Sequence, residues 1–370
     1  MTHGSRAGPR RNLPGIRIDV VAKEANVMCS FSIDVSTNSD GLAWPAVVAS
    51  REVPRMIGSS KILAALFLVM PFFRFGDSHD DDRCSKYVDC DRGETIMKSL
   101  QTLKPGDTLY IKGTCNENVT VASPTGQFNG VTFDGKGAAT ISGPSATENT
   151  LELDGVSSFT VRGLEITGGF DGLSVNTGSQ IAVDTVVVQN AGRHGIHFQR
   201  GTTMAYVINS TVQNNPQNGI IVNENSYARI GFTAGVGASE ADTGPCVIQG
   251  NGGHGIRIQR SSSARIYVST ISNNGQNGVN VESASYAEVA TNVINGNKKN
   301  GVSVAENSTL HLGNATGTKT EDNPNTTTVA NGQFGLQAQW GAYVQGRLGT
   351  LTGTSGASSF THDANDNLTP

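Results

Sequence analysis

The sequence carries little charge, few aromatic residues and no apolar run of membrane length. Only 16% of the 370 residues are charged and 6% are aromatic, and the net charge is −4. This composition lacks the basic stripe with interleaved aromatic rings that nucleic-acid binding needs, so no nucleic-acid partner is expected. The most apolar stretch, residues 62–73, is short of the roughly 20 residues that span a bilayer, so no membrane span is expected after processing.

Patterns that bind metals or cofactors are also missing. The seven His residues are scattered, the six Met residues do not cluster, and no C-x-x-C occurs. Asp134 and Asp154 stand in matching Asp-Gly turns that we expect on neighbouring coils. Asp171 lies farther along the chain, and two or three turn carboxylates are too few for calcium, which takes about 6–8 oxygen ligands. The sequence therefore predicts no metal and no cofactor, and it assigns both aspartates to turns.

Glycine is abundant instead, at 45 of 370 residues, about 12% against an average of roughly 7%. It recurs in one phrase, an Asn-rich turn, then Gly, then alternating apolar residues, as in NNPQNGIIV at 214–222. The separations between successive phrase glycines are 23, 24, 36, 23, 23 and 34 residues by subtraction, for Gly172, Gly195, Gly219, Gly255, Gly278, Gly301 and Gly335. A fixed period in the low twenties with short strands is typical of a β-solenoid.

The second and fourth residues of each phrase, counted from the glycine, are apolar and should point inward. They are the pairs Leu173/Val175, Ile196/Phe198, Ile220/Val222, Ile256/Ile258, Val279/Val281 and Val302/Val304. The third and fifth residues should point outward. Asn recurs before the glycine, and stacked turns should join these side chains into an amide ladder, at Asn190, Asn214, Asn215, Asn251, Asn273, Asn274, Asn295 and Asn297. The two long separations contain insertions at 231–245 and 313–328, which we expect to be loops on one side of the coil.

The ends of the chain lack this period. Residues 1–55 are interpreted as a disordered or untranslated leader, and residues 56–76 as a secretory signal with Lys61 before an apolar run. An uncleaved anchor is the alternative for residues 56–76. A short amphipathic helix near residues 96–103 should cap a solenoid over residues 85–350, and residues 351–370 should form a disordered tail.

Cysteine usage is consistent with export. Removal of Cys29 with the leader would leave four cysteines. Cys90 and Cys115 bracket the first helix-and-strand unit and are expected to be bonded, which would stabilise the fold by roughly 3 kcal/mol. A Cys84–Cys246 bond is a further possibility, and free thiols throughout are the alternative. The predicted location is secreted, periplasmic or at the cell surface.

Polar residues at outward positions form a strip along the repeat strands. The candidates for glycan binding are His197, Gln199, Arg200, Glu224, Arg257, Gln259, Arg260 and Glu282. A linear sugar chain along the helix axis could contact this strip, and arginine suits sugar carboxylates. The alternative is a solvated face on which Arg200, Glu224 and Arg260 are cross-strand pairs. A second ladder of the same kind is predicted at Arg229, Arg265, Glu288 and His311.

Two stretches resemble a known family. VDCDRGETIMKSLQTLKPGDTLYIKGTCNENVTV at 88–121 resembles the N-terminal cap of secreted bacterial right-handed parallel β-helix proteins. The N-x-x-x-x-G-[IV]-x-[VI] repeats resemble those of the pectate-lyase-like superfamily, which includes NosD-like proteins and carbohydrate-binding and sugar-hydrolase types. The resemblance implies an all-β, right-handed parallel β-helix of the pectin-lyase-like type with a capping helix.

Two functions fit this resemblance. The first is binding of a polysaccharide or another cell-surface partner by a monomer. The second is a polysaccharide-active enzyme, namely a lyase, hydrolase or epimerase. Sugar hydrolysis needs two carboxylates that converge on one sugar ring, and the sequence shows no such complete catalytic set. The sequence therefore favours binding, with the catalytic residues unknown.

Overall fold

The computed structural model describes residues 16–24, 27–35, 85–233, 243–313, 324–360 and 367–368. These residues belong to two units, Met1–Cys84 and Ser85–Pro370. In the first unit, β1 (Ile16–Glu24) and β2 (Val27–Val35) pair as an antiparallel hairpin. The expected disorder is corrected for these two strands, whose alternating apolar residues are typical of a hairpin. The leader assignment stays a prediction, and the predicted signal at 56–76 lies outside the described residues.

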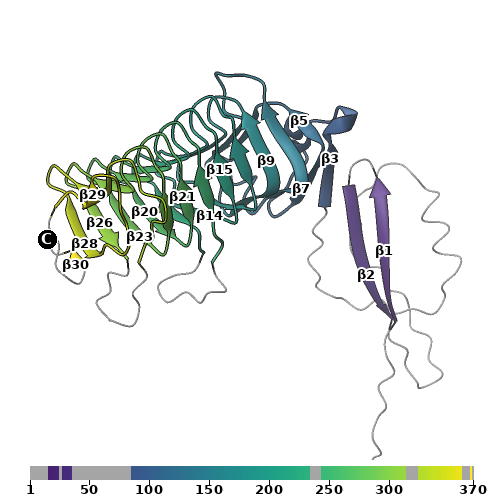
Figure 1. The fold of residues 1–370 in the computed structure, drawn as a ribbon. Helices are drawn as coiled ribbons and strands as arrows, with labels where there is room; N and C mark the ends of the chain where they lie inside the picture. Colours follow the sequence, from purple (N-terminus) through teal and green to yellow (C-terminus); the bar gives the residue numbers. More distant parts are fainter. Residues whose placement is uncertain are drawn as a thin grey trace, which may run out of the picture. The chain divides into compact units, whose positions relative to one another are not determined.

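The second unit is the predicted parallel β-solenoid, and its coils contribute strands to three faces (Figure 1). The phrase strands form the first face, a sheet of 10 strands: β6 (Val119–Ala122), β8 (Leu151–Asp154), β10 (Leu173–Asn176), β13 (Ile196–Phe198), β16 (Ile220–Val222), β19 (Ile256–Ile258), β22 (Val279–Val281), β25 (Val302–Val304), β27 (Phe334–Ala338) and β29 (Gly356–Ser358).

The other two faces follow in each coil. The second face contains β3 (Ser85–Asp89), β4 (Thr108–Lys112), the first parts of β7 (Thr132–Gly143) and β9 (Phe159–Gly168), β11 (Gln180–Asp184), β14 (Met204–Ile208), β17 (Tyr227–Ile230), β20 (Ser263–Tyr267), β23 (Tyr286–Ala290), β26 (Thr309–Leu312) and β28 (Tyr343–Arg347), with β30 (Asn367–Leu368) antiparallel to β28. The third face contains β5 (Thr114–Asn116), the last parts of β7 and β9, β12 (Val187–Gln189), β15 (Thr211–Gln213), β18 (Val247–Gln249), β21 (Thr270–Ser272) and β24 (Val293–Asn295).

The core lies inside the coil and is built from the predicted inward pairs. All six pairs are fully buried and stack in register, for example Ile196 on Ile220 and Phe198 on Val222. Burial of each such aliphatic side chain stabilises the fold by about 1.5–3 kcal/mol. A one-residue slip would turn these side chains outward, so the apolar pattern fixes the strand register.

The predicted amide ladder is present in the turns between the third and first faces. The Asn251 amide nitrogen donates to Asn274 Oδ1 at 3.0 Å and to the Val212 carbonyl at 3.1 Å, and Asn251 Oδ1 accepts from the amide and backbone nitrogens of Asn215. Asn297 continues the ladder through Asn274. Three of the asparagines, namely Asn190, Asn214 and Asn273, instead lie one position before the ladder residue of their coil and have positive φ. Asn295 lies on β24. The eight asparagines thus serve three structural purposes.

Both predicted insertions leave the coil at the same corner, between the second and third faces. The first follows β17 and precedes β18, and the second follows β26. Thr326, near the end of the second insertion, bridges to Val293 on the third face. Residues 234–242 and 314–323 of these insertions lie outside the described residues.

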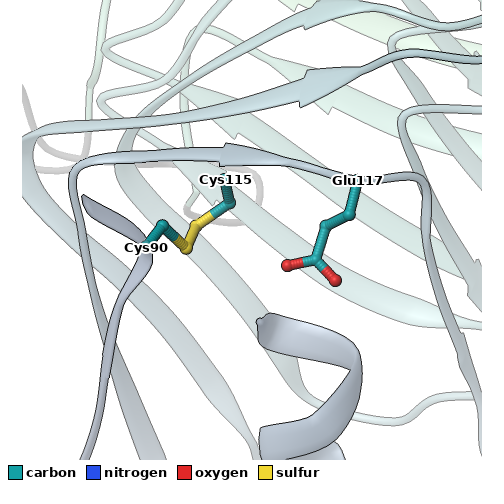
Figure 2. A group of neighbouring side chains, drawn as sticks. All are labelled: Cys90, Cys115 and Glu117. Atoms are coloured by element: carbon teal, nitrogen blue, oxygen red, sulfur yellow. A yellow bond between two sulfur atoms is a disulfide. The ribbon is translucent and has the colours of Figure 1, made fainter. Parts of the chain in front are cut away.

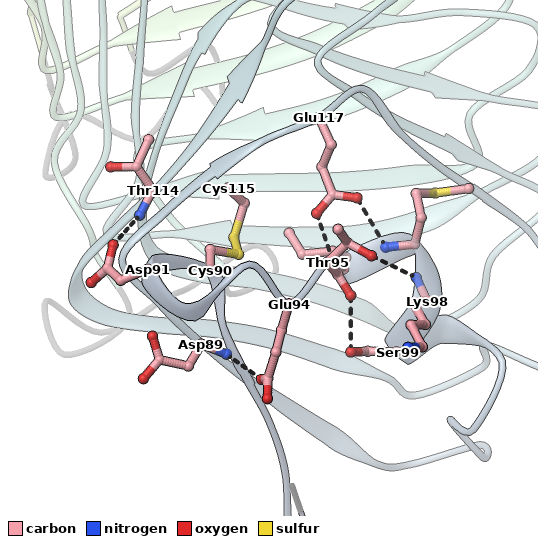
Figure 3. The surroundings of a disulfide bond; sticks show 12 residues. Asp89, Cys90, Asp91, Glu94, Thr95, Lys98, Ser99, Thr114, Cys115 and Glu117 are labelled. Atoms are coloured by element: carbon pink, nitrogen blue, oxygen red, sulfur yellow. Dashed lines mark hydrogen bonds between the residues drawn. A yellow bond between two sulfur atoms is a disulfide. The ribbon is translucent and has the colours of Figure 1, made fainter.

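A short helix, α2 (Ile96–Leu100), lies at the N-terminal end of the solenoid and buries Ile96 and Leu100, as predicted. Figure 3 shows that Glu117 accepts hydrogen bonds from two backbone nitrogens of the first helical turn, at 2.6 and 3.1 Å. The predicted Cys90–Cys115 disulfide is present beside this helix and joins segments 25 residues apart. The cap is therefore held covalently and by helix capping.

Two expectations about the chain need correction. Cys246 is a buried free thiol, so the suggested Cys84–Cys246 bond is wrong. The coil also continues beyond residue 350, because β29 pairs with β27 and Leu351 is buried. In the described ranges, no helix has the length and apolar content needed to cross a membrane.

Candidate functional site

An open hollow of about 440 Å³ lies where the turns from the third face meet the first face. Its floor includes Arg257 on β19 and Asn280 on β22, and Glu282 follows β22. Its rim comes from turn residues of successive coils, including Gln217, Gln276 and Lys299. The lining has no aromatic residue, so this hollow offers charge and hydrogen bonds.

A fixed network of polar groups forms the floor of the hollow. Both Nε and Nη2 of Arg257 donate to Glu282 Oε1, with the Nε contact at 2.7 Å. The amide of Asn280 donates to the other oxygen of Glu282 at 2.9 Å, and the amide of Asn277 donates to Asn280 at 2.9 Å. The arginine and the glutamate are only partly exposed, at 33% and 20% of their side chains. These groups are therefore oriented before any ligand arrives.

The residue just before each phrase glycine forms a buried polar ladder that we did not predict. His194 Nδ1 accepts from the Asn218 backbone nitrogen at 3.2 Å, and Asn218 Oδ1 accepts from the His254 backbone nitrogen at 2.9 Å. His254 Nδ1 then accepts from the Asn277 backbone nitrogen at 3.3 Å, and Asn277 Oδ1 accepts from the Asn300 backbone nitrogen at 3.0 Å. Burial lowers the pKa of both His194 and His254 to about 3, so both are neutral at pH 7.

An Asp–Arg–His cluster lies at the start of this ladder. Asp171 Oδ2 is 3.0 Å from His197 Nδ1, and Asp171 Oδ1 accepts from Arg193 Nε at 2.8 Å. Burial opposes ionisation, yet Arg193 and His197 hold the pKa of the Asp171 carboxyl well below its usual range. His197 Nε2 is buried and has no hydrogen-bond partner among the described residues. The guanidinium of Arg193 lies over the ring of Phe170 at 4.2 Å.

The predicted polar strip divides into four groups. Arg257 and Glu282 meet in the hollow, whereas His197 binds Asp171. Gln199 donates to Ser174 at 3.3 Å and Gln259 donates to Asn223 at 3.1 Å, so both amides are engaged within the face. At the edge, Arg200 is exposed and Arg260 pairs with Glu224 at 3.0 Å, which is the cross-strand pair considered as the alternative.

One expectation about neighbouring positions is wrong. Asp134 and Asp154 do not stand on one turn column, because Asp134 pairs in register with Arg162 on the second face. Asp154 lies beside Asn176 on the first face. The two aspartates lie on different faces because the early coils have different numbers of residues on each face.

The second predicted ladder is present on the second face. Arg229, Arg265, Glu288 and His311 are in register on successive strands. Glu288 accepts from Arg265, from the Tyr267 hydroxyl at 2.9 Å and from the Tyr286 hydroxyl at 2.8 Å. The sequence signal we missed is tyrosine, since all seven tyrosines of the chain lie on strands of this face.

One further group of possible metal ligands is already occupied. Figure 2 shows Cys90, Cys115 and Glu117 close together, but the two sulfurs form the disulfide. A disulfide supplies no thiolate ligand. The carboxylate of Glu117 caps α2. This group therefore serves the N-terminal cap.

Comparison with known proteins agrees with this architecture. The family model described as "Right handed beta helix region" matches residues 92–234 and 232–338. No curated protein sequence is similar enough to count as a match.

Similar solved structures are all distant in sequence. Pectate lyase Pel9A has a TM-score of 0.45 and 14% identity over 72% of this chain and 73% of its own. The alginate lyase from Paenibacillus sp. str. FPU-7 has a TM-score of 0.36 and 14% identity over 71% and 94%. The Azotobacter vinelandii mannuronan C-5 epimerase AlgE4 A-module has a TM-score of 0.35 and 14% identity over 70% and 91%. At these values, none of the three assigns a substrate or a reaction to this chain.

Proposed function

The chain belongs to the family of right-handed β-helix proteins, and we propose that it binds an acidic polysaccharide in the hollow of the first face. The observation that carries this proposal is the preoriented Arg257–Glu282–Asn280 network on the floor of an open hollow. Ligand sites combine a concave surface with a few fixed polar groups, as this one does.

The charge of the hollow favours a ligand with carboxylates. Arg257 and Lys299 contribute two positive charges, and Glu282 contributes one negative charge, while the buried His254 is neutral at pH 7. Arginine binds carboxylates through two parallel hydrogen bonds, whereas lysine acts as a point charge. The rim position runs through Gln217, Gly253, Gln276 and Lys299 on successive coils about 4.8 Å apart, so a polymer along the axis meets a polar side chain on three of these four coils.

Export completes this proposal. The Cys90–Cys115 disulfide is typical of proteins in oxidising compartments, which supports the secretory signal predicted at 56–76. A secreted, periplasmic or surface-attached protein would meet polysaccharides there.

The test is retention on immobilised polyuronates and on neutral glucans. The masses of any soluble products are determined by mass spectrometry in the same experiment. We expect binding to polyuronates that weakens as salt rises, since exposed charges are screened within about 8–10 Å. Arg257→Ala and Lys299→Ala should each weaken it at least fivefold. Arg92→Ala is the control, because that arginine is exposed on the N-terminal cap, far along the chain from the hollow. Retention unaffected by either hollow variant would refute the proposal.

An enzymatic function is the second candidate, and the Asp171–His197 pair favours it. The aspartate orients the ring through Nδ1, which leaves Nε2 as the basic atom. In a lyase, Nε2 would take the C5 proton of a uronate while the C4–O bond breaks and the leaving oxygen is protonated by water; because Nε2 is buried, the substrate would have to displace the side chains that cover it. His197→Gln should then abolish unsaturated products without weakening retention. Unchanged product formation by His197→Gln, or no products from the unmodified protein, would reject this candidate.

A further inference from the structure

The polar ladder before the phrase glycines does not need a histidine at residue 254. At each level, a side-chain atom of one ladder residue accepts a hydrogen bond from the backbone nitrogen of the next. Oδ1 of Asn218, Asn277 and Asn300 does so at 2.9, 3.0 and 3.0 Å. Nδ1 of His254 does the same at 3.3 Å. Asparagine therefore fills this position equally well, and what histidine adds is its second ring nitrogen.

The ladder also fixes which ring nitrogen of His254 carries the proton. A backbone N–H can only donate, so Nδ1 is the unprotonated acceptor and the proton of the neutral ring lies on Nε2. Burial, together with the positive charges of Arg257 and Lys299, lowers the pKa of the ring to about 3. At neutral pH, His254 therefore presents one N–H donor and no charge.

This donor is available to a ligand in the hollow of the first face. His254 lines the hollow together with Arg257 and Lys299. Within the described ranges, its Nε2 has no hydrogen-bond partner, and it stays accessible to solvent, unlike the sealed Nε2 of His197. The residue as a whole is only 9% exposed, so the protein holds the ring in place. A fixed donor without a partner is ready for an acceptor oxygen.

The other donors of the hollow carry charge. Nε and Nη2 of Arg257 are bound to Glu282. This leaves Nη1 of Arg257 and Nζ of Lys299, which have no hydrogen-bond partner in the part of the chain that the structure describes. These charged groups suit a carboxylate. The neutral N–H of His254 adds no charge attraction and suits a hydroxyl or ring oxygen.

We propose that His254 is a specificity-determining residue of the hollow, and that its Nε2–H donates to an uncharged oxygen of a uronate unit whose carboxylate meets Arg257. This inference rests on the proposed binding of acidic polysaccharide. It narrows the ligand from any polyanion to a sugar acid. A polymer that carries carboxylates alone would leave the His254 donor unpaired, which costs binding free energy.

The test is isothermal titration of the full chain with hexagalacturonate, hexamannuronate and polyacrylate, which has carboxylates but no hydroxyls. His254→Asn keeps the ladder and removes the far nitrogen. It should weaken binding of an acidic hexasaccharide about fivefold, the size expected for one neutral hydrogen bond. This loss should be equal at low and high salt, whereas the loss from Lys299→Ala should shrink at high salt. Affinity for polyacrylate should not change with His254→Asn.

The chain offers a matched control in His194→Asn. His194 occupies the same ladder position two coils earlier and also accepts a backbone hydrogen bond through Nδ1, but it is not one of the residues that line the hollow. Its substitution should leave hexasaccharide affinity unchanged. In protein labelled with ¹⁵N-histidine, the nitrogen signals lost in His254→Asn should be those of a neutral ring protonated on Nε2. A ring protonated on Nδ1 would contradict the assignment.

The outcomes separate this inference from the proposed function. If Arg257→Ala weakens hexasaccharide binding and His254→Asn does not, the role of His254 is wrong and the proposed hollow stands. A loss from His254→Asn that shrinks with salt, or that is equally large for polyacrylate, would show that the residue does not bind an uncharged sugar oxygen. Hexasaccharide binding that Arg257→Ala leaves unchanged, or no binding at all, would overturn the proposed function and the role of His254 with it.

Discussion

Two buried histidines should make the solenoid lose stability as the pH falls. His194 and His254 are 5% and 9% exposed, and each Nδ1 accepts backbone hydrogen bonds from the next coil. Their folded pKa of about 3 lies below the ordinary value of 6.5. Between these pH values each histidine is protonated in the unfolded chain and neutral in the folded chain. The free energy of unfolding therefore keeps its full histidine contribution above pH 6.5 and decreases as the pH drops toward 3.

The size of this loss follows from the two pKa values. At pH 5.0 an unfolded histidine is mostly protonated, so each buried ring costs about 2 kcal/mol relative to pH 7.5, at 1.36 kcal/mol per pKa unit. The two together cost about 4 kcal/mol. Ordinary carboxylates remain largely ionised at pH 5.0, so their contribution to this change is small.

The chain supplies its own matched variant. Asn218, Asn277 and Asn300 occupy the same ladder position and accept or donate the same bonds. His194→Asn/His254→Asn should therefore keep the ladder and lose most of the pH dependence. Urea unfolding followed by circular dichroism at pH 7.5 and 5.0 measures both proteins. An equal loss of unfolding free energy in the two proteins between these pH values would refute the reasoning.

Three further predictions concern the scaffold. Cys90→Ala/Cys115→Ala opens a loop of 25 residues and should cost about 3.5 kcal/mol in the chain-entropy model, and a urea midpoint equal to that of the oxidised protein would contradict it. Asn251→Ala leaves buried backbone groups without partners and should cost about 3 kcal/mol, measured by urea unfolding, whereas a loss under 1 kcal/mol would show that the ladder is dispensable. Asn214 has φ of 55°, so Asn214→Gly should be nearly neutral in thermal unfolding and Asn214→Val should cost about 1–2 kcal/mol; equal melting temperatures would contradict the strain.

The sequence determined the solenoid and its interior. Inward residues such as Ile196 and Phe198 are set by a local alternation, and the period of the glycines brings each coil under the next, so the ladder of Asn251 and Asn274 follows from sequence alone. The Cys90–Cys115 bond was likewise predictable, because the cysteines flank one local unit. Each of these features depends on residues at a repeated or short separation.

Only the tertiary structure decided which outward side chains meet. Asp171 and His197 are 26 residues apart, and their contact depends on how the turn before one strand packs on the next coil. The tyrosines join one face because the length of each coil side places them there, and that length varies between coils. Periodicity fixes the coil, whereas a surface site depends on contacts between coils that the period does not specify.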